Sequence, residues 1–442
     1  MGIGPENPWW WDVLRLGQAS RFAGYFDFDW DSPDPVLRGK VLVPALNEPL
    51  EAVLKHGELR VPCEGDDVTL LYQGQRFPVD PATLPPVGEP RRRLVAELNS
   101  SLAKLVAFLT QQHYLLADWH EANARMNYRW FFAVNTLAAL RVEEEEVFLA
   151  THARILDWHQ RGLVDGLRVD HPDGLRDPFH YLQRLRVAAP KAWIIVEKIL
   201  QPGEELPAQW PVAGTTGYDF LNRATSLLAD PAGEVPLTQF YKEFTGEPVG
   251  WTVIVHEKKL LVLNELFGAE VDRLTRLLEW IVAERSLPFS QPVGMKEVEA
   301  GWGRTVPTRA RLPDQGQLGT SRPRPFMQTR CPFSRDQLRA ALCELAAAFL
   351  VYRNYARPSQ GCAAELQRTP ANTRHIEHAL ASARQSRTDL DAVFDFMGGP
   401  LLWRTVGPAE REFVLRFQQL TGPAMARAWR TPPSTVSTVS PP

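Results

Sequence analysis

The sequence predicts an α/β fold of the (β/α)8 barrel type. Two short apolar runs each end in a carboxylate, at Gly166–Asp170 and Ile194–Glu197, and a helix-like segment separates them. An amphipathic segment, Glu143–Arg161, precedes the first run and is followed by Gly162, a typical helix-end residue. Helices and strands that alternate with short links are typical of parallel strands joined by crossover helices. In such barrels the active site lies at the carboxyl ends of the strands, where both acids stand.

Composition and charge exclude several classes of protein. The 442 residues carry a formal net charge of -3, so the sequence indicates neither nucleic acid nor an anionic membrane as a partner. There is no N-terminal signal sequence and no apolar stretch long enough to span a bilayer, so we expect a cytoplasmic protein. The cysteines show no CxxC spacing and are predicted to be free thiols in a reducing compartment: Cys63, Cys331, Cys343 and Cys362.

Periodicity assigns the remaining segments. Residues 1–35 are predicted to form a loop-rich lobe with short strands, residues 36–90 a small β-containing unit, and residues 92–126 a helix. Further helices are predicted over 258–286, over 335–356 and over most of 370–420. Residues 287–330 are rich in Pro, Gly and Arg, a composition that favours a linker over an anion-binding patch.

The two strand-end acids form a candidate catalytic pair. Arg168 precedes Asp170 by two positions, so both side chains lie on one side of the strand and the guanidinium favours ionised Asp170. Glu197 follows an apolar run, which favours the neutral form that a general acid needs. A retaining glycosidase uses two such carboxyls about 5–5.5 Å apart. The alternative for a lone Asp after a strand is a helix cap, the role predicted for Asp173 and Asp177.

Other chemistries find little support in the sequence. His171 and His180 have no partner at metal-ligand spacing, so neither a metal ion nor a cofactor is expected. Gly214–Gly217 lacks the lysine and the glycine spacing of a phosphate-binding loop. No Gly-x-Ser-x-Gly elbow occurs, which argues against a serine hydrolase.

Longer segments resemble the maltooligosyl trehalose synthases of the α-amylase superfamily (glycoside hydrolase family 13). Asp165–Leu175 is similar to the nucleophile segment of these enzymes, and Glu197–Leu200 is similar to their acid/base segment. The similarity covers most of 1–286 and 333–427. Other similar segments are Asn7–Leu14, Asn127–Phe132, Val134–Glu143, Trp210–Phe220 and Arg416–Ala426.

The resemblance implies an isomerase of trehalose biosynthesis that acts by intramolecular transglucosylation with retention. The reducing-end α-1,4 bond of a maltooligosaccharide, or of a glycogen-derived glucan, would become an α,α-1,1 bond. Asp170 would be the nucleophile, Glu197 the general acid and base, and Arg168 would keep Asp170 ionised. The residues implied to bind or enclose the sugar are His171, Lys198, Tyr218, Trp9, Trp10 and Trp11.

The resemblance is incomplete at both ends. The family's third-strand segment, with an Asp and an Asn-His pair, and its later His-Asp segment, with the third catalytic carboxylate, have no counterpart in this sequence. We therefore expect the middle portion of a longer enzyme, with a partial (β/α)8 barrel that a second chain could complete. Its expected parts are an inserted lobe before the fourth barrel strand (1–126), a barrel segment with the catalytic acids (127–230), helical regions (231–286 and 331–427), a linker or non-family insertion (287–330) and a disordered tail (428–442).

The sequence is compatible with two other functions. The absent segments favour a catalytically inactive, carbohydrate-binding remnant. A plain α-1,4-glucan hydrolase is the third possibility, although the Trp-rich start and the Gly214–Asp219 segment are synthase-like.

Overall fold

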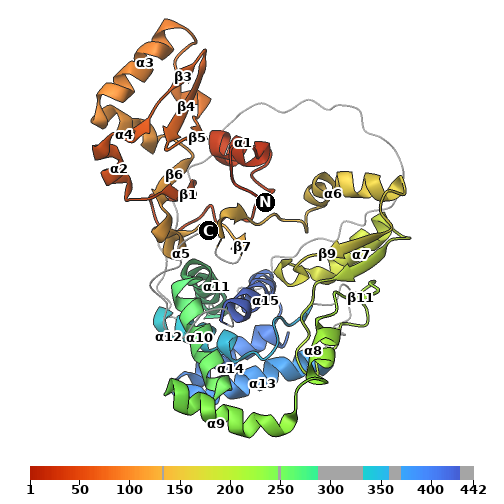
Figure 1. Cartoon of the computed structure of the whole chain (residues 1–442). Helices are drawn as coiled ribbons and strands as arrows, with labels where there is room; N and C mark the ends of the chain where they lie inside the picture. The colour runs from red at the N-terminus through yellow and green to blue at the C-terminus, as the bar shows by residue number, and fades with distance from the viewer. Residues whose placement is uncertain (132–133, 247–249, 287–331, 358–369, 429–442) are drawn as a thin grey trace, which may run out of the picture.

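The chain folds around three hydrophobic cores: an N-terminal lobe, a middle α/β unit and a C-terminal helical bundle (Figure 1). This computed structural model describes residues 1–131, 134–246, 250–286, 332–357 and 370–428. No helix within these ranges is long and apolar enough to cross a membrane. The predicted linker, 287–330, and all but the first residue of the predicted tail lie outside the described residues. Cys63 and Cys343 are free thiols, and Cys331 and Cys362 lie outside the described ranges.

The N-terminal lobe contains more regular structure than its composition predicts. The first helix, α1 (Pro8–Leu16), begins where the Asn7 side chain accepts hydrogen bonds from two helical amides. The helix predicted over 92–126 is interrupted because Ser101 is extended and caps a new helix. Beyond that helix, β6 (Tyr114–Asp118) pairs in parallel with β1 (Val41–Leu46). The other elements are α2 (Leu50–His56), β2 (Leu59–Arg60), β3 (Cys63–Glu64), β4 (Asp67–Tyr72), β5 (Gln75–Pro78), α3 (Glu89–Ser100), α4 (Leu102–Thr110), α5 (Ala122–Arg125), β7 (Trp130–Phe131) and β8 (Val134–Ala138).

The middle unit confirms the predicted order of helices and strands. It consists of α6 (Glu145–Gln160), β9 (Gly166–Val169), α7 (Pro178–Ala188), β10 (Trp193–Val196) and β11 (Gly214–Thr215). The three strands form a parallel sheet in the order β11-β10-β9. The Asp177 side chain accepts a hydrogen bond from the His180 amide, so Asp177 is the predicted helix cap. The α/β class is thereby confirmed, and the strands of the described ranges do not close into a barrel.

The C-terminal bundle supplies the largest core. Its helices are α10 (Trp251–Glu265), α11 (Gly268–Ser286), α12 (Arg335–Ala348), α13 (Pro370–Ser386), α14 (Asp391–Leu401) and α15 (Pro408–Ala428). Two further helices, α8 (Tyr218–Ser226) and α9 (Glu234–Thr245), precede them and contribute no buried residue. Ser334 and Gln337 form a capping box at the start of α12. The helix predicted over 335–356 ends at Ala348, and the mostly buried stretch 349–356 instead contacts the middle unit, where Arg353 donates a 2.6 Å hydrogen bond to the Asp173 carbonyl.

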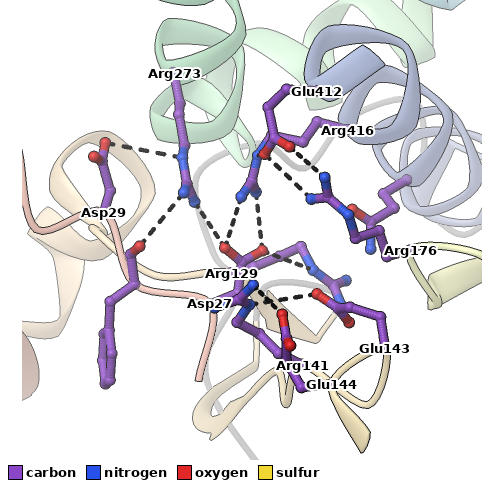
Figure 2. A network of polar contacts seen from close by, with 12 residues as sticks. Asp27, Asp29, Arg129, Arg141, Glu143, Glu144, Arg176, Arg273, Glu412 and Arg416 are labelled. Atoms are coloured by element: carbon purple, nitrogen blue, oxygen red, sulfur yellow. Dashed lines mark hydrogen bonds and ion pairs between the residues drawn. The ribbon is translucent and has the colours of Figure 1, made fainter. Parts of the chain in front are cut away.

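A cluster of arginines and carboxylates joins the three parts of the chain (Figure 2). At its centre the carboxylate of Asp27, from the N-terminal lobe, receives two 2.9 Å hydrogen bonds from Arg416 of α15 and one of 3.3 Å from Arg273 of α11. Glu412 pairs with Arg416 and with Arg176 of the middle unit. Burial alone would raise the pKa of Asp27, but the surrounding guanidinium groups hold it well below its usual range.

Glu412→Gln should destabilise the protein in a pH-dependent way. Burial opposes ionisation, but Arg176 and Arg416 together lower the pKa of Glu412 from 4.5 to about 2. Because the pKa of Glu412 is lower in the folded than in the unfolded chain, its ionised carboxylate stabilises the fold above pH 4.5. This stabilisation is lost as the pH falls toward 2. We expect a loss of at most about 3 kcal/mol in the free energy of unfolding at pH 7, and roughly half of that loss or less at pH 3, by urea denaturation. The exposed Glu97→Gln serves as the control without measurable effect. An equal loss at both pH values would contradict the assignment.

Candidate active site

The two predicted acids lie side by side at the carboxyl ends of adjacent strands. β9 ends at Val169 and β10 at Val196, and these two residues are paired in the parallel register. Asp170 and Glu197 are the next residues along each strand, and the Glu197 amide still donates a 2.9 Å hydrogen bond to the Val169 carbonyl. The register therefore brings together two carboxyls that are 27 positions apart in the sequence.

Arg168 contacts both carboxyls. Its guanidinium donates a 2.5 Å hydrogen bond to Oδ1 of Asp170, and its other terminal nitrogen lies 3.3 Å from Oε1 of Glu197. Arg168 and Asp170 project from the same side of β9, as their spacing predicts. The Asp170 side chain is 62% exposed and that of Glu197 is 23% exposed, so the two acids differ in solvation.

The environment moves the pKa values of the two acids in opposite directions. Partial burial would raise the pKa of Asp170, but hydrogen bonds from Arg168 and Glu197 and the charge of Arg168 lower it. The pKa of Glu197 is raised, first by burial and then by its hydrogen bond to Asp170 and the charge of that carboxylate. At neutral pH Asp170 is ionised and Glu197 is the member of the pair that holds a proton more readily. Such a division is what nucleophile-plus-acid chemistry requires.

His171 orients the loop that follows Asp170. Its backbone adopts a left-handed conformation with φ of 43°, which is uncommon for a residue other than glycine. In this conformation the His171 amide donates a 3.2 Å hydrogen bond to Oε2 of Glu197. Burial lowers the pKa of His171 to about 4, so the imidazole is neutral at pH 7. Gly174 is required beneath the ring because a Cβ there would come within 2.6 Å of it.

A cavity of about 570 Å³ opens over the two acids. Tyr218, the first residue of α8, reaches Glu197 with its hydroxyl 3.4 Å from Oε1. Tyr352 and Arg427, from the C-terminal part of the chain, complete a polar and aromatic wall. The full lining is Phe131, Val134, Asp170, His171, Asp173, Glu197, Ile199, Tyr218, Tyr352, Ala426 and Arg427. Its size and its few polar groups among aromatic and apolar side chains are typical of a small-molecule site.

Lys198 lies beneath the cavity and does not line it. Its ammonium is fully buried, 3.3 Å from Oδ2 of Asp173 and 2.9 Å from Oε1 of Glu204. Tyr355 donates a hydrogen bond to the other oxygen of Asp173. Asp173, predicted as a helix cap, is thus part of a buried ionic network. No local sequence motif indicates the roles of Glu204 and Tyr355.

The structure does not bring the N-terminal tryptophans to the carboxyls. Trp10 is buried in the core of the N-terminal lobe, against Phe26 and Tyr128. Trp9 packs on Phe22 and Tyr25, and Trp11 lies on the same helix, α1. None of the three lines the cavity over the acids.

One group of possible metal ligands among the described residues lies away from the two acids. Among the described residues, the only cluster with metal-ligand geometry is Glu48, His56 and Glu58, in the N-terminal lobe. All three side chains are partly or largely exposed, and none lines the cavity over Asp170.

Comparison with known proteins links this geometry to one group of enzymes. No family model matches the chain. Two Mycobacterium tuberculosis proteins, provisionally named maltooligosyl trehalose synthases (strains CDC 1551 / Oshkosh and ATCC 25618 / H37Rv), are 37% identical over 282 residues, 63% of this chain and 33% of each relative. The maltooligosyltrehalose synthase of Arthrobacter ramosus superposes with a TM-score of 0.69 and 35% identity. The predicted resemblance is confirmed.

The match covers only part of each synthase. The superposition on the Arthrobacter ramosus enzyme includes 97% of this chain and 44% of that enzyme. A glycosyltrehalose synthase from DSM5389 gives the same coverage, with a TM-score of 0.65 and 25% identity. The chain therefore spans about a third of the length of the curated synthases and less than half of the solved ones.

Proposed function

We propose that this chain carries the catalytic acids of a maltooligosyl trehalose synthase. The proposed reaction converts the reducing-end α-1,4 bond of a maltooligosaccharide into an α,α-1,1 bond. One observation carries the proposal: a more readily ionised Asp170 and a Glu197 of raised pKa stand next to each other at the ends of adjacent parallel strands. The synthase homology specifies which retaining reaction this pair would perform.

In the first step a carboxylate oxygen of Asp170 attacks the anomeric carbon of the penultimate glucose unit. The bond to the glycosidic oxygen breaks, and Glu197 gives that oxygen its proton, so the terminal glucose leaves with a new hydroxyl. The products are a covalent glycosyl–Asp170 ester, a free glucose and an ionised Glu197. Arg168 stabilises Asp170 as an anion before this attack.

In the second step the released glucose returns through its anomeric hydroxyl. Ionised Glu197 removes the proton from that hydroxyl, whose oxygen attacks the ester-bound anomeric carbon and displaces Asp170. Two inversions give net retention and an α,α-1,1 bond. Water would give hydrolysis if it reached the ester first, so the glucose must be held in a closed pocket. Tyr218 and the neutral His171 are placed to contact the sugar.

The finer architecture is part of the proposal. We assign β9, β10 and β11 to a partial (β/α)8 barrel that further polypeptide, including a second chain, would complete. The domain limits belong to the same proposal: 1–126 is an inserted lobe, 127–230 is the barrel segment with the catalytic acids, and 231–286 and 331–427 are helical regions. Maltooligosaccharides or glycogen-derived glucans are the proposed substrates.

The test is incubation of the purified chain with maltohexaose while reducing ends and products are followed. Loss of reducing ends without matching release of glucose would support synthase chemistry. Free glucose as the main product would indicate a hydrolase. Binding of maltohexaose without turnover would indicate a catalytically inactive protein that binds carbohydrate.

Arg168→Met should shift the pH profile of kcat/KM upward. Arg168 lowers the pKa of Asp170 and also that of Glu197, so its removal should raise both. Asp170 must be ionised and Glu197 protonated, so the acid and the alkaline limbs of the profile should both move to higher pH. An unchanged acid limb, measured with maltohexaose over pH 3 to 9, would show that Arg168 does not control Asp170.

A further inference from the structure

The helices α8 and α9 expose an apolar surface that no described part of the chain covers. Neither helix has a buried side chain, and both lie at the periphery of the molecule (Figure 1). Leu228 is 91% exposed and Phe240 is 63% exposed. We name as the α8–α9 face the large exposed apolar residues of this region: Phe220, Leu221, Leu227, Leu228, Val235, Leu237, Phe240, Tyr241 and Phe244.

These helices are too short to be stable without burial. α8 has 9 residues and α9 has 12, whereas isolated helices below about 12–15 residues are marginal in water. Helices in proteins are stabilised mainly by packing of an apolar face. Exposed apolar side chains gathered on neighbouring helices mark a site of association. The α8–α9 face therefore requires a partner.

The solved synthases contain more polypeptide than this chain supplies. This chain superposes almost entirely on the Arthrobacter ramosus synthase, yet accounts for only 44% of that enzyme, so more than half of the synthase polypeptide has no counterpart here. The parallel sheet is also incomplete: among the described strands, β9 and β11 each pair with β10 alone. Parallel strands normally lie inside larger sheets that are covered on both faces.

We infer that the α8–α9 face is the docking surface for a polypeptide equivalent to the unmatched part of the synthase fold. The face is continuous with the candidate active site, since α8 begins at Tyr218, which contacts Glu197 and lines the cavity. The docked polypeptide would close the open side on which Asp170 is exposed. The inference rests on the proposed function for this last role, which is retention of the released glucose.

The experiment co-expresses the full chain with the segments of the Arthrobacter ramosus synthase that lie outside the superposed part. Association is measured by native mass spectrometry and by titration of the purified components. Hydrogen exchange of α8 and α9 is followed with and without those segments. The double variant Leu228→Ser/Phe240→Ser disrupts the face. The matched control is Val87→Ser/Val406→Ser, which replaces two apolar side chains outside the face that are 61% and 63% exposed.

We expect a complex in which α8 and α9 are protected from exchange, with affinity lowered roughly tenfold or more by the face variant and unchanged by the control. Equal affinity of both variants would overturn the inference, as would unchanged exchange in α8 and α9 or failure of a folded segment to bind. A chain that dimerises through this face by itself would overturn it too, because the occupant would be a second copy. A protected complex that makes no α,α-1,1 product would refute the proposed function and leave the docking surface standing.

Discussion

Asp170→Asn should abolish turnover of maltohexaose, with kcat/KM lower by roughly 10³-fold or more. The amide is a poor nucleophile and cannot form the glycosyl ester, while its size and its hydrogen bond from Arg168 are largely kept. Glu197→Gln should cause a loss of similar size, because the leaving oxygen then receives no proton. The two losses should not add in the double variant, since both residues act in one step.

The chain contains a matched control for this experiment. Asp389 follows Arg387 by two positions, is paired with it at 2.7 Å and is 62% exposed, which reproduces the Arg168–Asp170 arrangement at a position that does not line the cavity. Arg387 also holds the pKa of Asp389 below its usual range. Asp389→Asn should leave kcat/KM unchanged. Equal activity of Asp170→Asn and the native chain, in a preparation that turns over maltohexaose, would exclude Asp170 as nucleophile.

The acids could be predicted because local rules determine their position. A strand presents alternate residues on one side, and neighbouring parallel strands end at the same edge of the sheet, so Arg168, Asp170 and Glu197 had to meet. Their opposite pKa directions follow from the same local features, a guanidinium for Asp170 and burial for Glu197. The capping role of Asp177 was predictable for the same reason, since a cap acts within its own helix.

Residues whose roles depend on distant partners were not predictable. Trp10 belongs to an aromatic cluster with residues far along the chain, so its sequence context did not show that it is buried in a core. The apolar residues of Tyr114–Asp118 continue the helical spacing of the preceding segment. These residues nevertheless form a strand, because they pair with β1. Asp173 lies three positions after Asp170, but its partners Lys198 and Tyr355 come from two other parts of the chain.

Lys198→Met is the second change with a large expected effect. The ammonium of Lys198 is the cation between the buried carboxylates of Asp173 and Glu204, and the ring of Tyr355 lies 5.5 Å from it. Removing one partner of a buried ionic network leaves uncompensated charge, which costs about 3–5 kcal/mol. Lys198 directly follows Glu197, and Asp173 lies in the loop after Asp170. Disruption of this network should therefore loosen both segments that carry the proposed catalytic acids.

Hydrogen exchange of the loop after Asp170 and of the stretch 349–356 measures this loss locally. The expected cost corresponds to exchange that is about 10²–10⁴-fold faster than in the native chain. The matched control is Lys198→Met/Asp173→Asn/Glu204→Gln, which removes the cation together with both anions and keeps the packing volume. It should recover most of the protection, because neutral amides replace the buried carboxylates that would otherwise lack a cation. If the triple variant exchanged as fast as Lys198→Met, packing of the lysine stem rather than its charge would hold the two segments together.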